Sequence, residues 1–435
     1  MTSAAVITDR IAGLVLTRPT HWGFVAGLAV SGALTLLFAI AIGYLFARGV
    51  GIWGVNQPVA WAFALTNFVW WVGIGHAGTF ISAFLLLLRQ RWRTSINRFA
   101  EAMTIFAVAM AGLMPILHLG RPWFAYGLVP YPDVMNVWPQ WRSPLIWDIF
   151  AIGTYIVVSI LFWYMGLVPD LATLRDRARG RTAQVIYGLL ALGWRGEARQ
   201  WQRYESAYLL MAGLATPLVI SVHSVVALDF SYGLVPGWHS TIFPPYFVAG
   251  ALYSGFAMAL VIAVPLRSAF ALQDLISVRH LAKMGTLMLV TGLLVAYSYL
   301  VEAFTAFYSV DRFEIANLID RYTGHYAILA WLVVLCNVVV PQALWSPAVR
   351  HRPLALFAIA LVVLVGMWLE RFVIIVQSLS RDFLPSAWHV FVPTLWDWAT
   401  LAGSIGTFAL LFLLFLRFLP AISMAELRKD AVERP

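Results

Sequence analysis

The sequence contains few charged residues for its length. Only 11% of the 435 residues are Asp, Glu, Lys or Arg, whereas 61% are hydrophobic and the mean hydropathy is +0.81. A soluble protein carries about 25% charged residues, so too few are present here to cover a water-facing surface. This composition excludes a soluble enzyme, a nucleic-acid-binding protein and a disordered regulator. It indicates a membrane protein that crosses the bilayer several times.

Cysteine is almost absent, since Cys336 is the only one. A single cysteine cannot form an internal disulfide, ligate an iron–sulfur cluster or provide the CxxCH attachment of a c-type haem. Any redox centre must therefore belong to a partner protein, or be a haem held by histidines alone. The first twenty residues lack a clear basic-then-apolar signal with a cleavage site, so we expect them to be retained.

Long apolar runs dominate the rest of the chain. A bilayer core about 30 Å thick needs roughly 20 apolar residues of helix to cross it. Ten segments qualify: residues 21–47, 58–88, 99–120, 144–167, 204–227, 245–266, 281–308, 325–346, 353–377 and 393–419. The longest connection, residues 168–203, contains PDLATLRDRARGRTAQ and predicts a short surface helix.

Lys and Arg are unevenly divided between the two sides that these spans define. The N-terminus, the even-numbered loops and the C-terminus hold 22 of the 29 basic residues. The other 7 are Arg48, Arg121, Arg142, Arg312, Arg321, Arg371 and Arg381. Basic residues favour the cytoplasmic side, so ten spans with both termini in the cytoplasm are predicted. Topology then explains the net charge of +9, without a nucleic-acid partner.

The loops on the non-cytoplasmic side have a distinct composition. Residues 121–143, 228–244, 309–324 and 378–392 are rich in Trp, Tyr, Pro and Asp. Aromatic belts at the membrane interface account for part of this composition. The prolines predict an irregular backbone, which suggests a docking surface for another protein.

An imidazole and a carboxyl group are expected to lie near each other on that side. His118 is near the end of the third span in MPILHLGRPW, and Asp148 lies about one turn into the fourth. Helices joined by one loop are often neighbours, so the two side chains can meet at similar depth. Such a pair can take two protons from a quinol, with His118 as acceptor and Asp148 orienting it or accepting the second proton. The alternative is a structural hydrogen bond that closes a helix corner.

Further ionisable residues lie in the spans or at their ends, where their energetic cost makes them candidate functional groups. Toward the non-cytoplasmic side these are His223, Asp229, Glu302, His325, Glu370, Arg371 and Asp397, and in the cytoplasmic half they are His76 and Glu101. Glu370 and Arg371 are adjacent at the end of the ninth span, so each is expected to pair with another span. His76 and Glu101 either begin a proton path or form a buried hydrogen-bonded pair.

Three classes of function fit these observations. The first is a quinone-handling subunit that passes electrons to clusters of a partner. The second is a b-type cytochrome with haem between histidines of facing helices, such as His76, His118 and His223. The third is a secondary transporter, which would place its site at the midplane between broken helices.

Several long stretches resemble one known family. They are WVGIGHAGTFISAFLLLLRQRWRTSINRFAEAMTIF, LHLGRPW, RSPLIWDIFAIGTYIVVSILFWYMGLVPDLATLRDRA and GMWLERFVIIVQSLSRDFLPSAW. Together they resemble the NrfD-like family, the polysulfide-reductase type of quinone-interacting membrane subunit. Within that family the nearest resemblance is to ActC, a quinol-interacting subunit of bacterial alternative complex III. The resemblance covers nearly the whole chain from about residue 20.

The resemblance implies an all-α membrane fold built from two four-helix bundles. Spans two to five and six to nine form the bundles, and the first and tenth helices flank them. The expected boundaries are residues 1–57 for the lead-in and first helix, 58–227 for the first bundle with the quinol site, 228–378 for the second bundle, and 379–435 for the tenth helix and cytoplasmic tail.

The resemblance also implies a function and partners. A quinol, menaquinol or ubiquinol, would bind near the periplasmic side at His118 and Asp148, with Arg121, Asp229 and Arg371 as further binding candidates. Electrons would pass to a periplasmic iron–sulfur subunit and then to multihaem and monohaem cytochrome c subunits, beside a second NrfD-like membrane subunit. Protons would be released to the periplasm, and His76, Glu101, His223, Glu302 and Glu370 are candidates for a proton path. This chain would hold no metal or haem and would lie in the bacterial plasma membrane.

Overall fold

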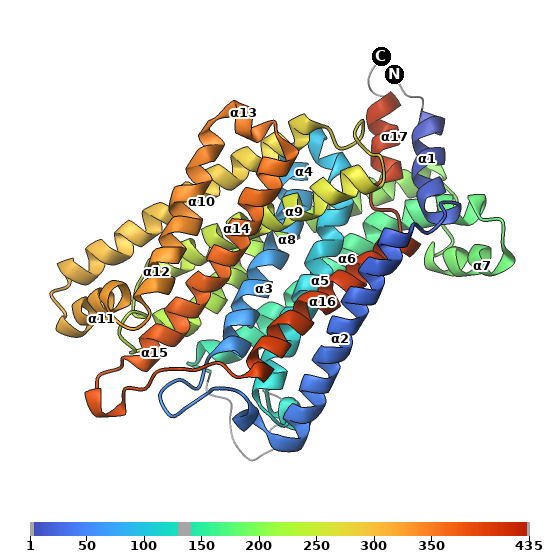
Figure 1. The fold of residues 1–435 in the computed structure, drawn as a ribbon. Helices are drawn as coiled ribbons and strands as arrows, with labels where there is room; N and C mark the ends of the chain where they lie inside the picture. Colours follow the sequence, from blue (N-terminus) through green and yellow to red (C-terminus); the bar gives the residue numbers. More distant parts are fainter. Residues whose placement is uncertain (1–3, 129–140, 433–435) are drawn as a thin grey trace.

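The computed structural model describes residues 4–128 and 141–432, and every regular element among them is a helix (Figure 1). Ten helical segments are long and apolar enough to cross a membrane, which confirms the predicted number of spans. They are α2 (Trp22–Arg48), α3 with η2 and α4 (Phe63–Leu87), α5 (Asn97–His118), α6 (Pro144–Arg177), α8 (Ala198–Ser231), α9 (Phe243–Ala269), α10 (Val278–Tyr308), α12 with η5 and η6 (Ala327–Trp345), α14 with η7 and α15 (Pro353–Ser380) and α16 (Leu395–Phe418).

Shorter helices lie between or beyond these spans. They are α1 (Ala4–Leu16), η1 (Val50–Ile52), η3 (Arg91–Ser95), η4 (Pro122–Leu128), α7 (Arg181–Leu190), α11 (Arg312–Thr323), α13 (Pro347–Arg350), η8 (Pro385–Ala387) and α17 (Met424–Val432). The surface helix predicted within residues 168–203 is α7. The flanking spans reach further into that connection than predicted, since α6 ends at Arg177 and α8 begins at Ala198.

The segment 309–324, predicted as an irregular loop, is largely helical. Asp311 is the N-cap of α11, and its carboxylate accepts hydrogen bonds from the backbone N–H groups of Phe313 (2.8 Å) and Glu314 (3.4 Å). A capping carboxylate satisfies N–H groups that the first helical turn leaves free, so this short polar helix begins at a defined residue. Part of another predicted loop, residues 129–140, lies outside the described residues.

The spans form two four-helix bundles that meet along α3 and α9. The first bundle contains α3, α5, α6 and α8, and the second contains α9, α10, α12 and α14. Helices α2 and α16 pack against each other and flank the bundles, as Figure 1 shows. The predicted fold class is therefore confirmed.

Small residues let the central helices approach closely. A Cβ at Gly78 in α3 would lie 2.1 Å from the carbonyl oxygen of Ala100 in α5. A Cβ at Gly255 in α9 would lie 2.0 Å from the Cβ of Ala77 in α3. Helices in lipid associate largely through van der Waals packing, so these contacts place α3 at the centre of the molecule.

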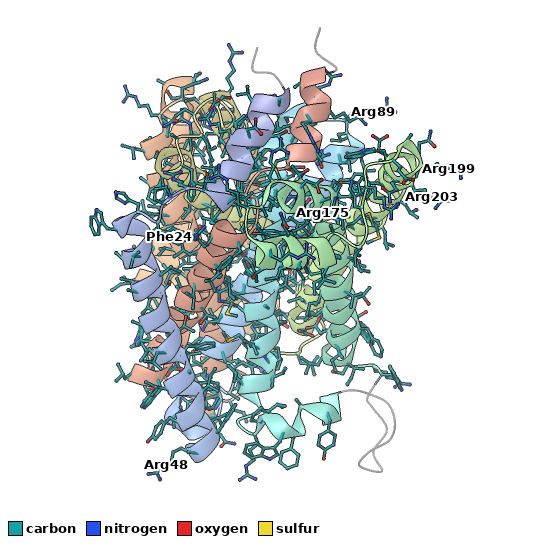
Figure 2. All side chains as sticks on the ribbon, turned by 90° about the vertical axis from the view of Figure 1, so that its right-hand side faces the viewer. Phe24, Arg48, Arg89, Arg175, Arg199 and Arg203 are labelled. Carbon is teal, nitrogen blue, oxygen red and sulfur yellow. The ribbon has the colours of Figure 1, made fainter. Side chains whose placement is uncertain are left out.

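The two ends of the molecule carry different elements. Both termini lie at one end, where α1 packs against α17, and we call this the termini end (Figure 1). We call the opposite end, which carries η1, η4, α11 and η8, the loop end. Figure 2 shows Arg89, Arg199 and Arg203 near the termini end, whereas Arg48 lies at the loop end.

Candidate functional site

Two carboxyl groups face each other at the loop end of the first bundle. Asp148 is the fifth residue of α6 and is 6% exposed, and Asp229 lies two residues before the end of α8. The two side chains are close enough to interact directly. The Oδ1 atom of each is buried without a hydrogen-bond partner among the described residues. Asp148 therefore faces a second acid, a contact that the sequence analysis did not anticipate.

His118 is the last residue of α5 and lies at the same end. Its imidazole stacks on the indole of Trp53, with ring centroids 6.4 Å apart and planes inclined by 11°. Its Nδ1 atom is buried and has no hydrogen-bond partner among the described residues. The hydrogen bonds and ion pairs of that part of the chain do not join His118 to Asp148, so the helix-corner hydrogen bond considered above is not among them.

The chain turns sharply after His118. Gly120 has φ +66°, a left-handed conformation that costs glycine little. A Cβ at this position would lie 2.9 Å from Cγ1 of Val50 in η1. The turn thus holds the end of α5 against η1, close to Trp53, on which the His118 ring stacks.

A second polar group lies in the middle of the first bundle. His76 is fully buried, its Nδ1 lies 2.5 Å from the carbonyl oxygen of Val72, and its ring stacks on Tyr155 with centroids 4.6 Å apart. The ring of His223 lies 4.8 Å from that of His76. Nε2 of His76 and both ring nitrogens of His223 are buried without a partner in the described residues.

Glu370 and Arg371 form the polar centre of the second bundle. Glu370 accepts hydrogen bonds from the hydroxyl group of Tyr299 in α10 and from Nδ2 of Asn337 in η5, the latter at 3.3 Å. The guanidinium of Arg371 lies 4.0 Å from the ring centre of Phe247 in α9. The expectation that each residue contacts another span is correct, but the two also form an ion pair with each other at 3.0 Å.

The membrane depths predicted from the sequence for Arg371, His76 and His223 are wrong. The ninth span continues to Ser380, so Arg371 lies nine residues, or about 14 Å of helix, before its end. The sequence predicts His76 and His223 in opposite halves of the membrane, yet their ring centroids are 4.8 Å apart. Both errors have the same cause. Span ends predicted from hydropathy do not determine how far a residue lies from the membrane surface.

π-Helical turns accompany the polar centre of the second bundle. Asn337 lies within the π-helical segment η5 (Leu335–Val339), and η7 (Val373–Gln377) begins two residues after Arg371. Such turns are rare and often mark functional positions, because the extra residue leaves backbone groups free and redirects side chains.

Glu101 belongs to a different network at the termini end. Arg98 lies 3.0 Å from Glu101 and 3.2 Å from Asp170, and the hydroxyl of Tyr208 donates to Glu101 at 3.0 Å. The predicted alternative of a hydrogen-bonded His76–Glu101 pair is therefore wrong, since each bonds elsewhere. The charge count places Arg98 among the loop arginines, but its side chain is fully buried.

The remaining candidates divide between structural contacts and exposed positions. Glu302 pairs with Arg321 at 2.6 Å. Asp397 caps α16 by accepting from the backbone of Thr394 at 2.8 Å and also accepts from Gly54 at 2.9 Å, so its role is structural. His325 lies against Tyr326, with ring centroids 5.0 Å apart. Two further side chains, Arg121 and Arg142, are exposed at the loop end.

Comparison with known proteins identifies the family. Residues 51–381 match the family described as polysulphide reductase, NrfD, which covers most of the chain. The chain belongs to the NrfD family. Three curated proteins are similar over nearly their whole length. A membrane subunit of a dimethyl sulfoxide reductase from Halobacterium salinarum is 24% identical over 89% of this chain and 90% of the relative. A selenate reductase subunit from Mesobacillus selenatarsenatis is 20% identical over 94% of this chain and 95% of the relative, and the integral membrane subunit of menaquinone reductase from Nitratidesulfovibrio vulgaris is 22% identical over 88% of this chain and 89% of the relative. This NrfD-family chain is thus similar to membrane subunits of reductase complexes.

The histidines of this NrfD-family chain are poorly arranged for a haem. Two axial histidines must stand on opposite faces of a macrocycle, whereas the rings of His76 and His223 touch directly. This contact weakens the b-type cytochrome hypothesis for these two residues.

Several residues that form these buried polar clusters were not among the candidates predicted from the sequence. They are Tyr155, Tyr246, Tyr299, Asn337, Arg98 and Asp170. Asn337 could have been predicted as a functional candidate, because it is the only amide side chain in the apolar run AWLVVLCNVVV. The tyrosines gave none, since tyrosine is common in membrane spans near the interface.

Proposed function

We propose that this chain is the quinol-oxidising membrane subunit of a complex like bacterial alternative complex III. It binds menaquinol or ubiquinol at the loop end, passes electrons to an iron–sulfur partner and releases protons on that side. The facing carboxyl groups of Asp148 and Asp229, with their buried unpartnered oxygens, carry this proposal. His118 adds an unpartnered imidazole nitrogen at the same end.

The chemistry requires acceptors for two protons. Oxidation of a quinol to a quinone releases two electrons and two protons, which must leave together for charge to balance. His118 Nδ1 accepts one proton from a quinol hydroxyl, and the Asp148–Asp229 pair accepts the other. Two facing carboxyl groups repel each other when both are ionised, so such a pair is suited to bind and release a proton.

The electrons must leave through a partner. With one cysteine, this chain cannot ligate an iron–sulfur cluster, so we place the acceptor cluster in a protein docked on the loop end. The excess of Lys and Arg on the other side supports a periplasmic loop end. The proposed complex also contains multihaem and monohaem cytochrome c subunits and a second NrfD-like membrane protein.

The relatives support a quinone-linked role. One of them is named as the integral membrane subunit of a menaquinone reductase, and the other two as subunits of dimethyl sulfoxide and selenate reductases. We assign the oxidising direction here from the resemblance of the quoted stretches to alternative complex III.

A proton path through the membrane is a further part of the proposal. The rings of His223 and His76 are in contact in the middle of the first bundle. The ring of Tyr155 stacks on His76, and its hydroxyl group lies 3.1 Å from the hydroxyl oxygen of Thr79. We propose that these groups, with Glu370, Arg371 and Glu302 in the second bundle and Glu101 at the termini end, relay protons when quinol is oxidised.

The test replaces the three loop-end groups within the assembled complex. Asp148→Asn, Asp229→Asn and His118→Ala are each expected to lower quinol oxidation by a factor of about 100 or more, because general acid–base groups contribute about that much. Asp382→Asn is the matched control, since Asp382 is a partly exposed acid at the same end. Near wild-type rates in all three variants would refute the site.

A further inference from the structure

A long apolar cleft lies between α16 on one side and α9 and α14 on the other. Its volume is about 1140 Å³, and Trp70 and Trp71 of α3 form part of its lining. In Figure 1, α14 and α16 face the viewer with α3 between them. The residues that α16 contributes run from Trp398 to Arg417, so the cleft follows that helix for almost its whole length.

Two arginines line the cleft at the termini end. Arg18 donates to the carbonyl oxygen of Ala269 at 2.5 Å and packs over the ring of Phe270, with the guanidinium carbon 4.6 Å from the ring centre. Arg417 donates to the carbonyl oxygen of Val15 at 3.0 Å. Both side chains are half-buried, and neither is paired with a carboxylate in residues 4–128 and 141–432.

The other large groove at this end differs because acids as well as cations line it. It is lined by Arg93, Glu426, Lys429 and Glu205 among others, with a volume of about 1140 Å³. Three of its cations are paired with acids of the same chain: Arg93 lies 2.9 Å from Glu426, Lys429 lies 2.7 Å from Glu205 and Arg175 lies 2.8 Å from Asp176. Among the described residues, the lining of the apolar cleft contains Arg18 and Arg417 but no Asp or Glu.

We infer that the apolar cleft binds one anionic phospholipid. Its phosphate lies between Arg18 and Arg417, and its acyl chains lie along α16 against α9 and α14. Half-buried guanidinium groups without a carboxylate attract an anion, and a cleft that is otherwise apolar over the length of a membrane helix fits hydrocarbon chains. A quinone has the apolar chain but no negative charge, so it would leave the two arginines uncompensated.

Removal of the charges tests the headgroup contact. The purified full-length complex is reconstituted in nanodiscs containing phosphatidylglycerol and phosphatidylcholine, and bound lipid is then counted by native mass spectrometry. We expect retention of phosphatidylglycerol over phosphatidylcholine, and a loss of about fivefold for each of Arg18→Gln and Arg417→Gln. Arg199→Gln is the control, because Arg199 lies at the same end but does not line the cleft.

Filling of the cleft tests the acyl-chain contact without a change of charge. Ala409 of α16 lines the cleft, so Ala409→Trp is expected to displace the bound phosphatidylglycerol. Ala39→Trp is the control, because Ala39 is an exposed position of α2 outside the cleft. Equal retention of the two lipids, a quinone in place of the lipid, or unchanged lipid in Ala409→Trp would overturn the inference.

Discussion

Helix α6 carries one acid of each of two contrasting buried pairs. At the termini end, Asp170 and Glu101 share Arg98, which lies 3.2 Å and 3.0 Å from them. At the loop end, Asp148 faces Asp229, and among the described residues no cation forms an ion pair with either. The two acids of α6 are 22 residues apart, which is about 33 Å along the helix. One helix therefore spans the membrane with a neutralised acid at one end and an unneutralised acid at the other.

The two pairs differ in whether a cation and hydrogen-bond donors compensate their acids. Asp170 also accepts from the backbone N–H of Ala425 at 2.9 Å, which ties the C-terminal segment to the first bundle. Glu101 has the additional bond from Tyr208. A buried charge that is fully paired contributes to a fixed structure, whereas buried carboxyl oxygens without donors are free to bind a ligand or a proton. Three predictions test this contrast and a fourth concerns an acid outside both pairs; we give them from the largest expected effect to the smallest.

Loss of Arg98 should destabilise the protein most. Arg98→Leu leaves Glu101 and Asp170 buried without their cation, and removal of one partner of a buried ion pair typically costs about 3–5 kcal/mol. The expected result is a large fall in the thermal unfolding temperature of the detergent-purified protein. Arg199→Leu, at an exposed position, should leave that temperature unchanged. Similar unfolding of the two variants would show that Arg98 does not hold the network together.

Loss of the charge on Glu101 should have a smaller effect of the same sign. Glu101→Gln keeps an oxygen for Arg98 and an amide group near Tyr208, and Asp170 still compensates Arg98. A hydrogen bond to a charged group contributes about 1.5–3 kcal/mol, so a loss of about that size at most is expected. The measurement is again thermal unfolding, and a loss as large as that of Arg98→Leu would contradict the shared network.

Loss of an acid at the loop end should hardly change stability. Asp148→Asn breaks no ion pair in the described residues and removes a charge that faces another acid, so a change below about 1 kcal/mol is expected. The same variant should lose quinol oxidation, as stated above. A marked fall in the unfolding temperature would instead assign Asp148 a structural role and remove the contrast between the two pairs.

The smallest effect should come from an acid outside the spans. Glu314 in α11 accepts a hydrogen bond from the backbone N–H of Gly237 at 2.9 Å, and burial raises its pKa above the ordinary value of 4.5. The folded state then holds this proton more tightly than the unfolded state, so stability falls as the pH rises from 4.5 through the raised pKa.

Hydrogen exchange of residues 228–244 measures this effect. Protection in the wild-type protein should decrease slightly over that pH interval, and Glu314→Gln should remove the decrease. Asp382→Asn, at a partly exposed acid of the same end, should keep it. An increase of protection with pH in the wild-type protein would contradict the raised pKa.

Much of the fold could be predicted because it depends on local properties of the chain. Each span is a run of apolar residues long enough to cross a bilayer, so all ten were found, although α6 and α8 were predicted too short. The helix α11 was missed, because its first turn is set by the Asp311 cap in a short polar segment without apolar periodicity.

The candidate site could be predicted in its residues but not in its contacts. Asp148, Asp229, His76 and His223 stood out as ionisable groups in or near the spans. Their partners did not, because lipid-facing and core-facing positions of a membrane helix are both apolar and the pattern does not show which faces meet. Arg98 was assigned to a loop for the same reason, since its distance from the surface depends on the packing of α5 against α6.

The sequence by itself determined the class of protein, the number of spans and the distribution of basic residues, since hydropathy and charge act along the chain. The tertiary structure decided which buried charges are compensated. That outcome depends on which helices are neighbours, and close contacts at small residues such as Gly78 and Gly255 set the neighbours. The same packing joins Asp148 to Asp229, His76 to His223 and Arg98 to two acids, so these pairings arise only when the helices come together.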